Sequence, residues 1–159
     1  MGGFLSDLKP IPNSEVLNAT CGPARGNIYT HDTKIVHGYL GIPYAQPPIG
    51  PLRFKKPKSA DTWKTPLDCY KYGPIVPQSG DKVPGLFPPG YREQDEAHGL
   101  NLNVFGPSWK SKEFVSIVWD FQTQNGVFQA NGFPVMVYFH GGGFEMGLGS
   151  SFDDYSLSG

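Results

Sequence analysis

The chain has 159 residues, a formal net charge of −1 and 38% hydrophobic residues, which fits one ordinary soluble domain or part of a larger one. The near-neutral charge gives no reason to expect a nucleic acid or an acidic membrane surface as a partner. No apolar run reaches the roughly 18 residues of a membrane span, and 21 glycines with 16 prolines predict many turns and extended segments.

Residues 1–13 are predicted to be a short polar lead-in, followed by a domain over residues 14–159. The N-terminus lacks the basic region and the long apolar region of a secretory signal. It does match the pattern M-G-x-x-x-[ST], which makes Gly2 a candidate for N-myristoylation. We therefore expect a cytoplasmic protein, with weak and reversible membrane association where Gly2 is acylated.

Two cysteines, Cys21 and Cys69, form neither a metal-ligand spacing nor a redox spacing. The sequence leaves open whether they meet in space. Because the chain has no export signal, free thiols are the expectation.

Three short strands are predicted near the N-terminus, over Glu15–Thr20, Gly26–Thr30 and Lys34–Leu40. The segments Cys21–Pro23 and His31–Asp32 read as the turns between them. Together these elements predict a small antiparallel meander.

The middle of the chain carries weaker signals. Five prolines between Gly41 and Pro57 predict an extended run across a surface, and Pro77–Tyr91 reads as a long loop. The alternation of Leu100–Phe105 predicts another strand. No stretch has the length and periodicity of a convincing helix.

The most informative stretch is Pro134–Phe139, an apolar run of strand length that predicts a strand buried on both faces. This run is followed by His140, then by three glycines, Gly141–Gly143, and then by Phe144. Glycines let the backbone take positive φ and come close to a ligand. Their N–H groups can then point at developing negative charge, as in an oxyanion hole. The alternative is a plain glycine-rich turn. A phosphate-binding loop is excluded, because no Gly-Lys-Ser/Thr follows.

Several motifs stand in a familiar order: Gly38–Phe54 (GYLGIPYAQPPIGPLRF), Trp63, Leu100–Phe105 (LNLNVF) and His140–Gly147 (HGGGFEMG). In this order they resemble the N-terminal part of the type-B carboxylesterases, the family that includes the cholinesterases and the non-catalytic neuroligins. The resemblance covers roughly residues 20–110 and 131–159. It implies the N-terminal portion of an α/β-hydrolase fold, with an antiparallel meander, the first strands of the central sheet and few helices.

The resemblance also implies a serine esterase that works through an acyl-enzyme. Gly142 and Gly143 match the glycines whose N–H groups form the oxyanion hole, while His140, Gly141 and Phe144 are structural residues of that loop. His140 is not expected to be the catalytic base, because in α/β-hydrolases that histidine follows the nucleophile along the chain. No metal and no organic cofactor is implied.

The chain departs from the family in lacking any G-x-S-x-G nucleophile elbow. We therefore expect an N-terminal fragment without the catalytic triad, inactive alone, whose substrate would be a small carboxylic ester once the missing part is supplied. Two alternatives stay open: a non-catalytic, neuroligin-like interaction module, and a truncated product without function.

A second departure lies just before Leu100. Val76 and Gly99 stand where the family usually has a disulfide, and Ala97 stands where the family has the glutamate that pairs with Arg53. Glu96 is the candidate substitute partner for Arg53, and the alternative is that this segment is loose. Residues 77–99 contain no tryptophan to hold a cationic substrate, which argues against choline esters.

A third departure is an atypical insertion over residues 112–130. Within it, Val115–Gln129 begins with Val-Ser and ends with Phe-Gln, which GTAAGT and TTTCAG can encode. We hypothesise a retained intron or gene-model error there. The alternative is a genuine surface insertion, although long structureless loops in a compact domain are uncommon.

Overall fold

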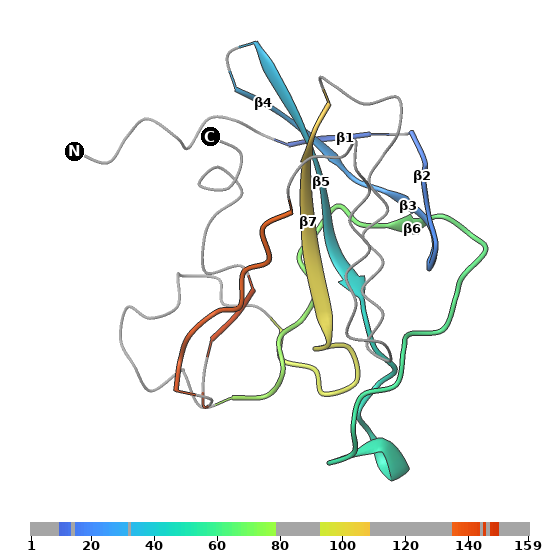
Figure 1. Ribbon diagram of the computed structural model, residues 1–159, viewed down its shortest axis with the longest axis vertical. Coiled ribbons are helices and arrows are strands. Elements are labelled where there is room, and N and C mark those ends of the chain that lie inside the picture. Colours follow the sequence, from blue (N-terminus) through green and yellow to red (C-terminus); the bar gives the residue numbers. More distant parts are fainter. Residues whose placement is uncertain are drawn as a thin grey trace.

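The computed structural model describes residues 10–13, 15–31, 33–78, 93–108, 135–143, 145 and 147–149, with only the backbone of His31 and Lys34. These residues form seven strands and one 3-10 helix, arranged in two small sheets (Figure 1). In chain order the elements are β1 (Ile11–Pro12), β2 (Leu17–Ala19), β3 (Gly22–Arg25), β4 (Asn27–His31), β5 (Lys34–Pro43), η1 (Gly50–Leu52), β6 (Leu67–Asp68) and β7 (Asn101–Pro107).

The first sheet has the order β1-β4-β5-β7, and all its neighbours are antiparallel. The β4–β5 hairpin pairs Asn27 with Gly38 and His31 with Lys34, which confirms two of the predicted strands. The predicted strand at Leu100–Phe105 is also confirmed, as β7, which lies along β5 at the centre of the molecule (Figure 1).

The second sheet has the order β2-β3-β6, so the predicted single meander is wrong: its strands divide between two sheets. The turn predicted at Cys21–Pro23 is wrong in part, because Gly22–Arg25 forms β3. Proline is tolerated in a strand whose ladder is incomplete, and β6 pairs only with Ala24 and Arg25. The two-residue strand β6 was missed because so short a segment has no periodicity to read.

The β5–β7 ladder contains a bulge between Tyr39 and Ile42. Gly41 lies in it with φ +71°, and a Cβ there would come within 2.8 Å of the Gly73 amide nitrogen. The Gly41 N–H instead donates to Oδ1 of Asn103 on β7, at 3.0 Å. The bulge therefore depends on a glycine and on one β7 side chain.

A small core forms around Ala24, Tyr39 and Cys69, with the half-buried side chains Leu17, Ile42, Leu67 and Val104 packed against it. Cys69 directly follows β6, and the other residues lie on strands of both sheets, so the core joins the two sheets. Cys21 and Cys69 are both free thiols in this structure, and Cys69 is buried.

Helical structure is sparse, as predicted. The part of the chain that the structure describes contains one helix, the three-residue η1 within the proline-rich segment. This helix lacks the length and the apolar character needed to cross a membrane.

The strand predicted at Pro134–Phe139 is not confirmed. Pro134 lies outside the described residues, and Val135–Phe139 has no strand pairing. Its five side chains are 44–83% exposed, and Figure 1 shows the segment to one side of β7. The reason is physical: an apolar run specifies that a segment can be buried, but a strand also needs a paired neighbour and a covering layer.

Candidate oxyanion loop

The glycine-rich loop has the backbone conformation that three glycines permit. Gly142 has φ +130° and Gly143 has φ +65°, both in the region that side chains disfavour. The Glu145 N–H donates to the Gly142 carbonyl at 3.2 Å, which closes a turn over these residues. Residues 141–143 are exposed. Around Gly141 and Gly143, no described atom lies within 4 Å of where a Cβ would be, so a ligand could approach the backbone closely.

His140 lies against the backbone of its own loop. Its Nδ1 is 2.8 Å from the Gly141 carbonyl oxygen. A Cβ placed on Gly147 would overlap the His140 ring, so the two residues are in direct contact. The structural role of His140 stays a prediction. Phe144 and Gly2, also singled out from the sequence, lie outside the described residues.

Two side chains that the sequence analysis missed attach this loop to the rest of the fold. The Gln78 carboxamide bonds both backbone groups of Gly147, and Asn103 on β7 donates to the Gly149 carbonyl at 3.4 Å. Leu148 between them is buried. Nothing in the local sequence could have revealed these contacts, because Gln78 and Gly147 are 69 residues apart.

The chain segments on either side of residues 79–92 contact each other without a disulfide. A Cβ on Gly99 would come within 2.7 Å of Val76 Cγ1, so the two positions that lack the family's cysteines do face each other. Ile75 and Gln94 form a parallel bridge beside them. The predicted substitute pair is confirmed: Arg53 Nη1 is ion-paired with Glu96 Oε1.

A hydrogen-bonded pair of side chains stands next to this ion pair. His98 Nδ1 lies 2.6 Å from Asp95 Oδ2, and the Ala97 N–H donates to Asp95 Oδ1 at 2.7 Å. The hydrogen bond from His98, and then that from Ala97, lower the pKa of Asp95 below its ordinary value. These contacts organise the turn leading into β7.

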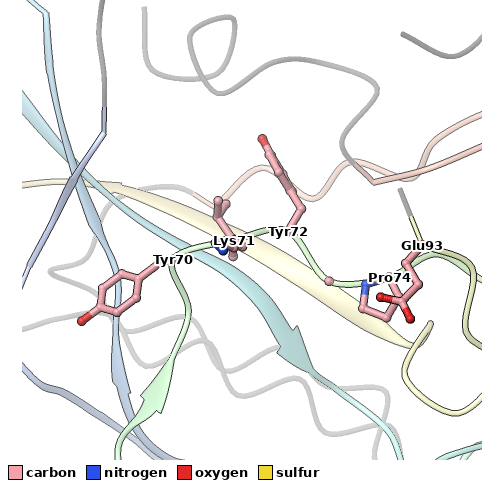
Figure 2. A pocket seen from close by; sticks show the side chains of 7 residues that line it. Tyr70, Lys71, Tyr72, Pro74 and Glu93 are labelled. Carbon is pink, nitrogen blue, oxygen red and sulfur yellow. The ribbon is translucent and has the colours of Figure 1, made fainter. Parts of the chain in front are cut away.

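A hollow of about 410 Å³ lies beside β5, lined by Leu40, Tyr70, Lys71, Tyr72, Gly73, Pro74 and Glu93. Figure 2 shows Pro74 and Glu93 together at one end of it and Tyr70 at the other. None of the residues predicted for the oxyanion hole lines it. Across the described residues, no group of three or more His, Cys, Asp or Glu side chains could hold a metal ion.

Comparison with known proteins decides the family. The model of the "Carboxylesterase family" matches residues 13–159. The chain belongs to the carboxylesterase family. This confirms the resemblance to type-B carboxylesterases drawn from the GIPYA and HGGGF motifs.

Among curated relatives of this carboxylesterase chain, the esterase cest-33 of Caenorhabditis elegans is 52% identical over 161 residues, covering 100% of this chain and 26% of that protein. The para-nitrobenzyl esterase of Bacillus subtilis is 36% identical over 115 residues, covering 72% of this chain and 19% of its own length. The solved structure of a thermophilic PNB esterase matches with a TM-score of 0.63 at 33% identity, covering 87% of this chain and 24% of that one. The fold is thus the N-terminal portion of an α/β-hydrolase, and the chain spans about a quarter of the cest-33 protein.

Proposed function

We propose that this chain is the N-terminal part of a carboxylic-ester hydrolase, a serine esterase acting through an acyl-enzyme. In that enzyme the loop at Gly142 and Gly143 supplies oxyanion-hole N–H groups. The observation that supports this is the open glycine loop itself, with both residues at positive φ in a chain of the carboxylesterase family.

The chemistry follows from the charge that develops during ester cleavage. When a nucleophile attacks an ester carbonyl, the oxygen becomes an oxyanion, and preorganised N–H groups stabilise it. Losing one such donor typically costs roughly 100- to 1,000-fold in rate. The exposed Gly142 and Gly143 leave room for that oxygen, since a glycine backbone has no side chain to block it.

The nucleophile, the base and the acid are proposed to come from residues that correspond to the remaining three quarters of the relatives. The 159 residues contain no G-x-S-x-G, the motif on which the α/β-hydrolase serine stands. The chain alone is therefore expected to hydrolyse no ester. The substrate is proposed to be a small carboxylic ester, bound once those residues are present.

A chimaera tests this proposal. The region of the C. elegans esterase cest-33 that aligns with this chain would be replaced by the chain, and p-nitrophenyl acetate hydrolysis would be measured. We expect no turnover by the chain and turnover by the chimaera. Gly143→Ala in the chimaera keeps the N–H, but its Cβ disfavours the positive φ that orients this N–H by about 1–2 kcal/mol, so we expect a loss of roughly tenfold in kcat. Gly50→Ala is the matched control, because Gly50 also has positive φ but lies in the proline-rich segment. A folded chimaera without turnover would contradict the proposal.

Sequencing the transcript from the codon of Lys110 through and beyond Gly159 separates the alternatives. A message that skips Val115–Gln129 and continues into a G-x-S-x-G segment supports the esterase. A continuation whose elbow lacks serine supports a non-catalytic interaction module. A message that retains those codons and stops after Gly159 supports a truncated product.

A further inference from the structure

We propose that Gln78 is a positioning residue that holds the oxyanion loop in place by imitating a neighbouring backbone strand. The Gly147 N–H donates to Gln78 Oε1 at 2.6 Å, and Gln78 Nε2 donates to the Gly147 carbonyl at 2.9 Å. Both backbone groups of one glycine are thus satisfied by one carboxamide, as a paired strand would satisfy them. The positioning role rests on the proposed function of Gly142 and Gly143, whereas the docking contact itself does not.

Gln78 can act in this way because it is itself firmly held. Its own N–H donates to Gln94 Oε1 at 2.8 Å, and its Nε2 also lies 3.3 Å from the Val76 carbonyl. Just before it, Ile75 is buried and exchanges backbone hydrogen bonds with Glu93 and Asp95, at 3.0 and 2.9 Å. The carboxamide therefore projects from a segment that is already fixed to the turn before β7.

The restraint on Gly147 reaches the predicted oxyanion donors through direct contact. A Cβ on Gly147 would overlap His140 Nδ1 and the Gly141 carbonyl oxygen, so Gly147 packs on the first two residues of the loop. The turn from Gly142 to Glu145 connects these two ends. A shift of Gly147 would therefore shift the glycines beside His140, and small displacements of catalytic groups are costly.

A second anchor acts on the following residues. Leu148 is 7% exposed, and Asn103 connects the Gly149 carbonyl with the N–H of Gly41 in the β5 bulge. The 3.4 Å contact to Gly149 is long, so most of the polar restraint falls on Gln78.

The chemistry requires a neutral amide at position 78. A glutamate there would keep the acceptor for the Gly147 N–H, but its second oxygen would face the Gly147 carbonyl without a proton. Protonation restores a donor in the same place. A Gln78→Glu variant should therefore dock the loop at acidic pH, below the ordinary glutamate pKa of about 4.3, and release it at neutral pH.

The test measures backbone order in the 159-residue chain by NMR, with no ester present. Hydrogen exchange would be followed at Gly147, and the ¹⁵N heteronuclear NOE at Gly142 and Gly143. For Gln78→Ala, and for Gln78→Glu at pH 7, we expect exchange at Gly147 to accelerate at least about tenfold and the two NOEs to fall.

The amides of Leu40 and Cys69 are the internal references, because they donate to Cys69 and Arg25 in the core. Gln46→Glu is the matched control, since its carboxamide bonds Asp61 instead. At pH 4 the Gln78→Glu variant, compared with wild type at the same pH, should regain the protection of Gly147 while Gln78→Ala does not.

Unchanged exchange at Gly147 in both variants would overturn the proposal. An equal acceleration of exchange at Leu40 and Cys69 would also overturn it, since Gln78 would then stabilise the whole fold. A Gln78→Glu variant that does not regain protection of Gly147 at pH 4 would overturn it as well. Because none of these readouts involves ester hydrolysis, an inactive chimaera and a failed Gln78 test are separate results.

Discussion

The Arg53 guanidinium is paired with the Glu96 carboxylate, one position before the place where the family carries its acid. The same guanidinium lies 5.0 Å from the centre of the Phe54 ring. The two charged side chains are 52% and 40% exposed, so water screens much of their attraction.

A double-mutant cycle of Arg53→Gln and Glu96→Gln should therefore give a small coupling energy, about 0.5 kcal/mol in the free energy of unfolding. Urea unfolding measures it, and Lys55→Gln is the control for loss of a nearby positive charge. A coupling above about 2 kcal/mol would show that the pair is effectively buried.

The stability of the chain should fall as pH rises from 9 to 11 because of Cys69. Its thiol is 1% exposed, and burial, then the charge of Asp68, then Cys21, raise its pKa from 9.0 to about 11. Above pH 9 the unfolded thiol loses its proton while the folded one keeps it, so deprotonation favours unfolding. The loss attributable to Cys69 is on the order of 2 kcal/mol by pH 11.

Unfolding free energies at pH 8 and pH 10.5 would test this, with Cys69→Ala as the comparison. The variant is less stable at both pH values but should lose less between them. Equal losses in the two proteins would show that Cys69 does not titrate differently on folding.

Alanine substitutions at Gly41 and Gly50 should destabilise the fold to different extents. At Gly50 only the positive φ opposes a side chain, whereas at Gly41 steric crowding opposes it as well. Both have positive φ, at +71° and +52°, but a Cβ on Gly41 would meet backbone at 2.8 Å whereas no described atom lies within 4 Å of one on Gly50. Gly50→Ala should cost about 1–2 kcal/mol, and Gly41→Ala about 2–5 kcal/mol because overpacking adds to it. Thermal unfolding followed by circular dichroism measures both, and equal costs would mean that the bulge opens without penalty.

The exposed apolar segment Val135–Phe139 should make the chain self-associate. Met136 and Phe139 are its most exposed side chains, at 83% and 78%. The double substitution Met136→Lys/Phe139→Lys should lower the binding of an apolar dye by at least about twofold, since large apolar patches mediate association. Light scattering and dye fluorescence measure the effect, with Ile49→Lys as the matched control on another exposed apolar residue. If Ile49→Lys lowers dye binding and light scattering as much as the double substitution does, the chain does not associate through Val135–Phe139.

Much of the local structure could be predicted from sequence. The β4–β5 hairpin and β7 follow from alternating, β-branched segments bounded by turn residues, and these patterns are local. The short strand β6 could not be found this way, because its two residues become a strand only through pairing with Ala24 and Arg25 on β3.

By itself, the sequence determined the family, the position of the β4–β5 hairpin and the glycine loop, because motifs and periodicity are properties of neighbouring residues. Only the tertiary structure decided how β2–β5 divide between two sheets, which acid pairs with Arg53, and that Val135–Phe139 is exposed. It alone showed that Gln78 holds Gly147. These are contacts between residues distant along the chain, and their energies depend on which surfaces come together in space.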